Sequence, residues 1–340
     1  MLWFGPPFSV SRTTILSASA PPSALALIAP AMQQVDRVIH DRLTTGVPLV
    51  AQVSQYIISA GGKRLRPALL LLMAEALEYK GDKHYSLAAV VEFIHTATLL
   101  HDDVVDESTL RRGRPTANAT FGNPASVLVG DFLYSRSFQM MVETQSMRVM
   151  DILANATNII SEGEVLQLIN MHDASLSEED YLHVIRSKTA KLFEASTRIA
   201  AVLAGCDAAQ EERCAEYGQA LGTAFQIIDD VLDYEGTVED LGKNLGDDLR
   251  EGKTTLPLII AMREGTPEQA TVIRNAIEQG SVDALEAVVA IVRNTGALDG
   301  ARRAAAAEAQ RAIAATAGMP ENAHTQALRQ LAEQLQSRKT

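Results

Sequence analysis

The sequence predicts an all-α protein. Of its 340 residues, 47% are hydrophobic but only 5% are aromatic. Runs of strong helix formers recur, as in residues 68–77 and 301–316, whereas the alternation typical of strands is nearly absent. Outside the N-terminal residues, no window is long and apolar enough for a transmembrane helix. The length suits one large domain or two.

Charge and cysteine content narrow the classes of partner and compartment. The formal net charge of -12, with no long basic stripe, argues against nucleic acid. An acidic chain can hold an anionic substrate only through bound cations and locally placed lysines and arginines. Cys206 and Cys214 lack CxxC spacing and read as two structural thiols, so we expect a reducing compartment, the cytoplasm.

The first 24 residues differ in composition from the rest of the chain. Residues 1–30 contain one charged residue, Arg12, and several prolines. We expect residues 1–24 to be a disordered extension or part of an over-long start assignment. A secretory signal is the alternative, because SASA is like a cleavage site, but positive charge is missing and Pro6-Pro7 interrupts the apolar run.

Residues 61–67, GGKRLRP, predict an anion site at the start of a helix. A glycine pair precedes Lys63, Arg64 and Arg66, and Pro67 suits a first helical turn. Free N–H groups and the positive end of the helix dipole would favour a phosphate there. An ordinary basic loop that caps a buried helix is the alternative.

Residues 91–117 carry the central motif. Asp102, Asp103 and Asp106 fall within one helical turn, and His95 precedes them on the same side. Carboxylates this close repel one another unless a cation lies between them, which predicts a divalent metal. The alternative is a solvated acidic helix end, but the preceding TATLL is apolar and no Lys or Arg stands four residues after the aspartates.

Three arginines follow this helix. We expect Gly113 and Pro115 to end it and to leave Arg111, Arg112 and Arg114 beside the aspartates, where they can clamp phosphoryl oxygens.

Two further helices add polar residues whose roles stay open at this point. Glu162, Glu164 and Gln167 are consistent with a supporting layer around a site and equally with a helix surface. Residues 181–204 read as one long helix in which a lone Lys188 would ordinarily face solvent.

The aspartate motif recurs in residues 224–234, AFQIIDDVLDY. Asp229, Asp230 and Asp233 repeat the spacing, and Gln226 lies one turn earlier on the same face. Two such clusters, each after an apolar helical run, favour a metal site shared by two helices.

Residues 236–258 form a loop rich in glycine and lysine. It contains Lys243 and Lys253, and its composition suits a lid that closes over a charged ligand. From Pro267 onward the sequence predicts amphipathic helices, and we find no catalytic or ligand-binding motif in them.

Taken together, these motifs resemble the trans-prenyl diphosphate synthases, in the long-chain branch that makes the polyprenyl side chain of ubiquinone. The resemblance runs from Leu25 to the C-terminus and is carried by GGKRLRP, EFIHTATLLHDDVVDES, LRRGRPTAN, GDFLYSRSFQMM, EGEVLQL, SKTAKLFEA, GTAFQIIDDVLDY and LGKNLGDDLREGKTTLPL.

The resemblance implies a single all-α domain over residues 25–340, with about ten or more helices around a deep central cavity, as in an isoprenoid-synthase bundle. It implies a homodimer and a Mg²⁺-dependent prenyltransferase. Such an enzyme adds successive isopentenyl diphosphate units to an allylic diphosphate such as farnesyl diphosphate. An octaprenyl product is implied, with nonaprenyl (solanesyl) as the alternative.

Residue roles follow from the resemblance. Mg²⁺ would be bound by Asp102, Asp106 and Asp229, and Asp103, Asp230 and Asp233 would complete or orient the two clusters. Isopentenyl diphosphate would be held by Lys63, Arg66, His95 and Arg112. The allylic diphosphate would be surrounded by Arg111, Lys188, Thr189, Gln226, Lys243 and Lys253.

Product length is expected to depend on a tunnel beside the first aspartate helix. Short-chain members of the family resemble one another in a bulky aromatic residue five positions before the first aspartate, and Ala97 stands there in this chain. Ile94 lies next on that face, and the floor would involve Phe132 and Met140. A helix over residues 87–106 would be roughly 30 Å long, enough for a long chain.

Two other functions share part of the pattern. A terpene cyclase also uses a DDxxD helix but does not need GGKRLRP for a second diphosphate. A non-catalytic partner subunit could lose metal ligands, whereas both clusters are intact here. The apolar product also suggests transient membrane contact during release.

Overall fold

The computed structural model describes residues 24–59, 61–111, 113–235 and 246–336. Up to residue 143, the elements are α1 (Ala24–Leu27), α2 (Ala29–Arg42), α3 (Pro48–Ser59), α4 (Leu65–Ala76), α5 (Lys83–Val105), β1 (Leu110–Arg111), β2 (Arg114–Pro115), α6 (Ala117–Phe121) and α7 (Asn123–Glu143). The remaining elements are α8 (Met147–Ile169), α9 (Glu178–Ile185), η1 (Arg186–Ala190), α10 (Lys191–Leu203), α11 (Ala208–Glu235), α13 (Asp247–Arg250), α14 (Leu256–Glu264), α15 (Pro267–Gln279), α16 (Leu285–Asn294), α17 (Ala297–Ala315) and α18 (Ala323–Gln336).

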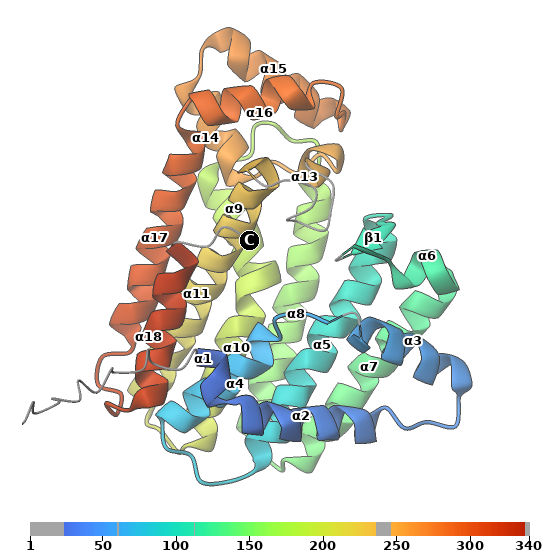
Figure 1. Cartoon of the computed structure of the whole chain (residues 1–340), viewed down its shortest axis with the longest axis vertical. Coiled ribbons are helices and arrows are strands. Elements are labelled where there is room, and N and C mark those ends of the chain that lie inside the picture. Colours follow the sequence, from blue (N-terminus) through green and yellow to red (C-terminus); the bar gives the residue numbers. More distant parts are fainter. Residues whose placement is uncertain (1–23, 60, 112, 236–245, 337–340) are drawn as a thin grey trace, which may run out of the picture.

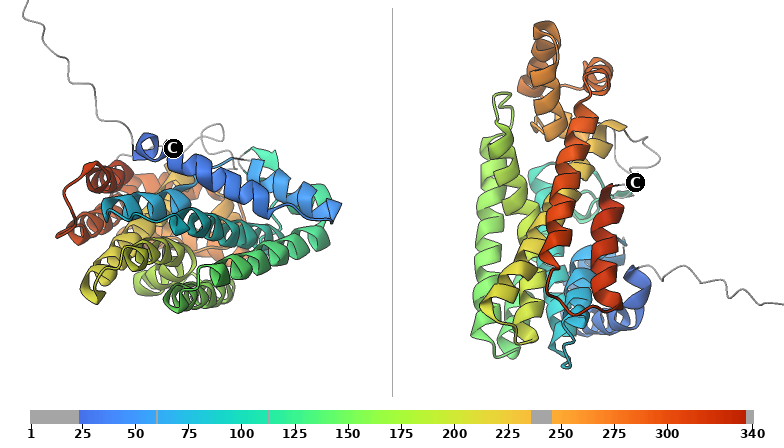
Figure 2. Two further views of the ribbon diagram at one scale, coloured as in Figure 1. Left: turned by 90° about the horizontal axis from the view of Figure 1, so that it is seen from below. Right: turned by 90° about the vertical axis from the view of Figure 1, so that its left-hand side faces the viewer.

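The long helices form a bundle along the long axis of the molecule (Figure 1). In it, α5 packs on α4 and α7, α10 packs on α8 and α11, and α11 packs on α17. Helix α2 crosses one end of the bundle, and α15 and α16 cross the other (Figures 1 and 2). In the described part of the chain, the only strands are β1 and β2, which form a small antiparallel hairpin, so the all-α prediction is confirmed.

Two apolar cores share helix α11. One core surrounds α4, whose residues from Pro67 to Met73 are all buried, and extends along α11 to Ala224. The other begins at Ile227 and continues into α14, α16 and α17. Gln226 stands between the two cores, so the polar side chains here separate the two apolar stretches of α11.

Helix α5 ends earlier than the sequence suggested. Its last residue is Val105, whereas Gly113 and Pro115 were expected to end it. Asp106 caps the helix, and Glu107 takes a φ of 50°, which turns the chain away from the helical path. Gly113, with a φ of 72°, instead lies in the turn of the β1–β2 hairpin. The hairpin therefore folds Arg111 back toward α5.

The expected single helix over residues 181–204 is divided by a π-helical turn. Helix α9 ends at Ile185, η1 follows, and α10 continues from Lys191. The turn packs against α8 and α11 at two glycines. A Cβ on Gly163 would lie 2.8 Å from Ser187 Cβ, and one on Gly222 would lie 2.7 Å from Ala190 Cα. Both neighbouring helices thus approach the turn more closely than a side chain would allow.

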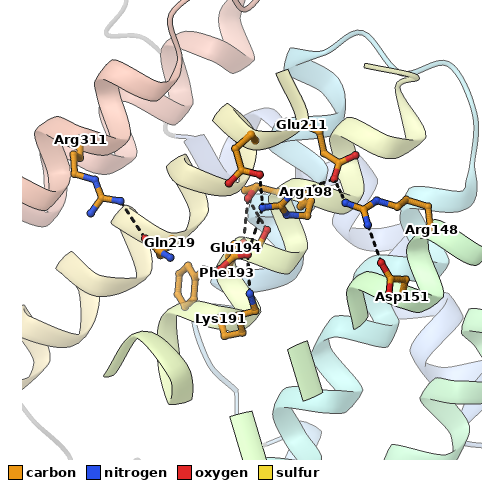
Figure 3. A network of polar contacts seen from close by, with 11 residues as sticks. Arg148, Asp151, Lys191, Phe193, Glu194, Arg198, Glu211, Gln219 and Arg311 are labelled. Carbon is orange, nitrogen blue, oxygen red and sulfur yellow. Dashed lines mark hydrogen bonds and ion pairs between the residues drawn. The ribbon is translucent and has the colours of Figure 1, made fainter. Parts of the chain in front are cut away.

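An ion network joins the outer parts of α8, α10 and α11 (Figure 3). Arg148 pairs with Asp151 and Glu211, and Arg198 pairs with Glu211 and with Glu194. Networks of this kind contribute more than isolated surface pairs because several charges share one geometry. The network fixes the start of α11 against α8 and α10.

Three further expectations concern the N-terminal residues, the two cysteines and membrane-spanning helices. Residues 1–23 lie outside the described residues, and the first described helix begins at Ala24. Cys206 and Cys214 are both free thiols, as expected. Among the described helices, none combines the length and the apolar character that a bilayer crossing requires.

Candidate active site

A cavity of about 640 Å³ opens between α4, α5, α8, η1, α11 and the loop after α13. The residues predicted for the site that line it are Lys63, Arg66, His95, Asp102, Asp106, Arg111, Lys188, Thr189, Gln226, Asp229 and Lys253. The structure therefore brings together residues from six separate sequence motifs in one chamber.

The first aspartate cluster is balanced by two lysines. Asp102 and Asp106 lie one turn apart near the end of α5. Lys188 Nζ lies 3.8 Å from Asp102 Oδ2, and Lys253 Nζ lies 3.4 Å from Asp106 Oδ2. Burial raises the pKa of Asp102, while the Lys188 ammonium opposes the rise. The lysine expected to face solvent thus faces the carboxylates.

Glu164 and Glu251 complete this charge cluster. Glu164 Oε2 lies 2.6 Å from Lys188 Nζ, and Glu251 forms a close ion pair with Lys253. Burial raises the pKa of Glu164 to about 7, against the opposing effect of the lysine. For Lys253, burial would lower the pKa, but Asp248 and the other facing carboxylates raise it above its ordinary range. Each lysine is therefore held between carboxylates from two different elements.

Asp103 does not face the cavity with its neighbours, which corrects the expectation that all three carboxylates share one face. Its side chain is fully buried, and Arg111 donates to Asp103 Oδ1 through Nε at 2.9 Å and Nη2 at 2.7 Å. Asn118 also donates to the Asp103 backbone carbonyl at 3.0 Å. Asp103 therefore anchors the β1–β2 hairpin, and with it Arg111, against α5.

The second aspartate cluster divides in the same way. Asp229 lines the main cavity, whereas Asp230 borders a side chamber of about 140 Å³. Asp230 accepts hydrogen bonds from Tyr181 Oη at 2.6 Å and Gln226 Nε2 at 2.7 Å. Asp233 is fully buried and lines neither chamber. One carboxylate of this cluster therefore faces the cavity that Asp102 and Asp106 also line.

A basic group lies at the start of α4. Arg66 Nη1 lies 3.1 Å from His95 Nε2, and the Arg66 guanidinium stacks over the Phe193 ring at 4.7 Å. Lys63 lines the cavity beside them. Arg64, which the sequence grouped with these cations, also lines the cavity and pairs with Asp36. The positive groups here suit an anion that is separate from the aspartate clusters.

Some predicted residues are not placed in this cavity. Arg112 and Lys243 lie outside the described residues. Ala97, Ile94 and Met140 are buried in the core around α5 and α7, and Phe132 packs against that core. None of these four lines the main cavity, so their role in a tunnel stays a prediction.

Comparisons with known proteins decide the family. The family model described as polyprenyl synthetase matches residues 47–292 of this chain. The chain belongs to the polyprenyl synthetase family. The octaprenyl diphosphate synthase of Escherichia coli (strain K12) is 53% identical over 303 residues, which cover 89% of this chain and 94% of that protein.

Other members of the polyprenyl synthetase family agree in fold and differ in product. The all-trans-nonaprenyl-diphosphate synthase (geranyl-diphosphate specific) of Rhodobacter capsulatus is 48% identical, over 89% of this chain and 94% of that protein. The crystal structure of polyprenyl synthase from Caulobacter crescentus CB15, complexed with calcium and isoprenyl diphosphate, is 46% identical with a TM-score of 0.90. The match covers 93% of this chain and 97% of the Caulobacter crescentus chain. The family resemblance read from the motifs is confirmed.

Sequence reasoning did not assign Glu164, Tyr181 or Glu251 to this polyprenyl synthetase site, and Glu251 carried no separate signal within its loop. Glu164 was open between a site role and a surface role, and its EGEVLQL segment was the available signal. Tyr181 carried no signal, because a tyrosine in a helix is ordinarily a core residue. Only the packing of α9 against α11 shows that it reaches Asp230.

The buried Asp103–Arg111 pair predicts an unequal response to two alanine substitutions. Asp103→Ala removes the buried partner of Arg111 and should lower the free energy of unfolding by about 2 kcal/mol. This loss is smaller than the loss expected for breaking a fully buried pair, because the Arg111 side chain is 32% exposed. Glu143→Ala breaks the exposed pair with Arg42 and should cost less than about 1 kcal/mol. Urea unfolding of both variants measures the difference, and equal losses would contradict this role of Asp103.

Proposed function

We propose that this chain extends an allylic prenyl diphosphate, such as farnesyl diphosphate, by successive addition of isopentenyl diphosphate. The observation that carries the proposal is one cavity with two places for a diphosphate, one where carboxylates can hold it through a metal ion and one where basic side chains can hold it directly. Asp102, Asp106 and Asp229 lie at one end, and Arg66 with His95 at the other. Two separate ends suit two diphosphate substrates. A terpene cyclase would need only one.

The product that we propose is a long all-trans polyprenyl diphosphate, most consistent with octaprenyl, for the side chain of ubiquinone. The identity to an octaprenyl diphosphate synthase supports this length. A nonaprenyl product is the second candidate, because a relative of nearly equal identity makes that chain.

We propose Mg²⁺ as the cofactor, and the donor set fits this ion. Among the described residues, no three acidic, imidazole or thiol side chains form a preassembled metal cluster. Mg²⁺ commonly uses one or two protein carboxylates and takes further oxygens from substrate phosphates. Asp102, Asp106 and Asp229 around an open cavity meet that requirement. When bound, the ion would neutralise diphosphate charge as a Lewis acid.

The chain's own residues supply the rest of the chemistry. Ionisation of the allylic carbon–oxygen bond leaves negative charge on the departing diphosphate, and the Lys188 and Lys253 ammonium groups are placed to stabilise it. Arg66 and Lys63 would orient isopentenyl diphosphate so that its double bond attacks the allylic cation. The departing diphosphate can accept the proton that is then lost.

Apolar side chains protect the cationic intermediate from water. Leu99, Leu192 and Phe225 line the cavity between its charged ends. Water that reached the allylic cation would end elongation as an alcohol, so an apolar wall preserves the repeated cycle.

We also propose a homodimer in the cytoplasm, with transient membrane contact during product release. Figure 2 shows α7 and α8 on the outer side of the bundle. Leu128 and Val142 on α7 are 65% and 62% exposed, and Ile169 on α8 is 71% exposed. Apolar side chains so exposed on adjoining helices favour a covering partner. The free thiols of Cys206 and Cys214 support a reducing compartment.

The first test is a product analysis with the purified full chain. Incubation with farnesyl diphosphate, excess isopentenyl diphosphate and Mg²⁺ should give an octaprenyl product, and a chelator should abolish it. Mass analysis of the extracted chains measures both effects. A nonaprenyl product would change the assigned length alone, whereas folded protein without any elongation would refute the proposal.

Bulk at position 97 should shorten the product. Ala97→Phe places a ring in the buried core around α5 and α7, where the proposed tunnel would run, so we expect the product distribution to shift to shorter chains. Ala97→Gly keeps the space open and should leave the distribution unchanged. Circular dichroism would establish that both variants fold. Identical products from all three proteins would remove Ala97 as the determinant of length.

The proposed dimer predicts a mass near twice 36.6 kDa by light scattering. Introducing charge at the exposed face, in a Leu128→Glu, Ile169→Glu double variant, should give a monomer because the charges would be desolvated on association. Val282→Glu, at an exposed apolar residue elsewhere, should leave the mass unchanged. A monomeric parent chain would exclude the homodimer, and a double variant that stays dimeric would exclude this face.

A further inference from the structure

Tyr181 is a buried phenol that the proposed chemistry does not use. It lies on α9, is 3% exposed, and donates a 2.6 Å hydrogen bond to Asp230 Oδ2. The main cavity is not in contact with it, whereas the side chamber is. A role for Tyr181 must therefore act through Asp230.

Tyr181 is one member of a closed set of hydrogen bonds. Gln226 Nε2 donates to the other oxygen of Asp230, Oδ1, at 2.7 Å. Thr189 Oγ1 donates to Gln226 Oε1 at 2.9 Å. Thr189 stands on η1, which continues directly from α9. These hydrogen bonds thus join the α9–η1 segment to α11 at two points, Tyr181 to Asp230 and Thr189 to Gln226.

This set fixes two residues that face the main cavity. Lys188 precedes Thr189 on η1, and Asp229 precedes Asp230 on α11. Gly222, one turn before Gln226, lets η1 lie directly on α11, which brings Thr189 within reach of Gln226. A shift of either element would move Lys188 relative to Asp229.

Packing alone does not hold the Asp230 side chain. The side chamber of about 140 Å³ leaves space beside Asp230, Gln226 and Thr189. A carboxylate next to open space can change rotamer unless hydrogen bonds hold it. The two donors to Asp230, one on each oxygen, supply that restraint.

We propose that Tyr181 is a positioning residue of the active site. It holds Asp230 and thereby sets Asp229 and Lys188 in register across the cavity. The inference rests on the proposed function, because Asp229 is taken there as a metal ligand. It adds a residue from α9, an element that contributes nothing to the lining of the main cavity.

The test compares Tyr181→Phe with Tyr217→Phe in the full chain. Tyr217 is the matched control, because it is also fully buried and its hydroxyl donates at 2.8 Å to Leu328 O on α18, away from the cavity. Two quantities are measured. One is the rise in melting temperature as Mg²⁺ is titrated in the presence of inorganic diphosphate. The other is the pair kcat and KM for elongation.

We expect Tyr181→Phe to raise the Mg²⁺ midpoint and to lower kcat, each about tenfold, the lower end of the effect seen when groups that orient metal ligands are removed. KM for isopentenyl diphosphate should stay within about twofold, since Arg66 and His95 stand on α4 and α5. Tyr217→Phe should change only the melting temperature without ligand. Equal midpoints for the two variants would overturn the inference, whereas a parent chain that shows no response to Mg²⁺ and diphosphate would overturn the proposed metal site as well.

A double-mutant cycle separates positioning through Asp230 from a general structural effect. In an Asp230→Ala chain, Tyr181→Phe should cause no further change in the Mg²⁺ midpoint. Independent, multiplying effects would overturn the inference. If Tyr181→Phe does not fold, Thr189→Val opens the same set at its other end and should raise the midpoint, and Thr189→Ser, which keeps the hydroxyl, should restore it. Equal midpoints for Val and Ser would overturn the inference.

Discussion

Repulsion among half-buried carboxylates is the constraint on which this structure depends. Asp102, Asp106 and Asp229 face one cavity from two helices, and each loses part of its hydration there. Lysines from two further elements supply the opposing charge, Lys188 from η1 and Lys253 from the loop after α13. The placement of those elements is therefore tied to the aspartates. Apolar cores on either side of Gln226 hold the charged layer in place.

Much of the site could be predicted from local spacing. The two DDxxD motifs, the basic residues at the start of α4 and the histidine of α5 are read from sequence alone, because helical periodicity fixes which neighbours share a turn. The structure confirms that Asp102 and Asp106 point into the cavity, and that Arg66 and His95 lie together. Family-like motifs extended this to residues far apart in the chain, and the matching relatives confirm the family.

The directions of single side chains could not be predicted, because they depend on tertiary contacts. Consecutive helical residues differ by about 100° in direction, so Asp103 turns from the cavity to Arg111 once α5 ends early and the hairpin folds back. Lys188 looked solvent-facing because its segment read as one regular helix. Nothing in the pattern signalled a π-helical turn, and the contact of Tyr181 with Asp230 exists only because α9 packs on α11.

The π-helical turn also gives one continuous segment two different orientations. A π turn holds more residues than an α turn, so the faces of α9 and α10 are offset around a common axis. Helix α9 can present Tyr181 to the acidic half of α11, while α10 presents Phe193 to Arg66 at the opposite end of the cavity. In a regular α-helix, the directions of Tyr181 and Phe193 would be fixed relative to each other by the uniform helical repeat. The irregular turn thus changes the helical register, so that one continuous segment contacts both the acidic part of α11 and the basic group at the start of α4.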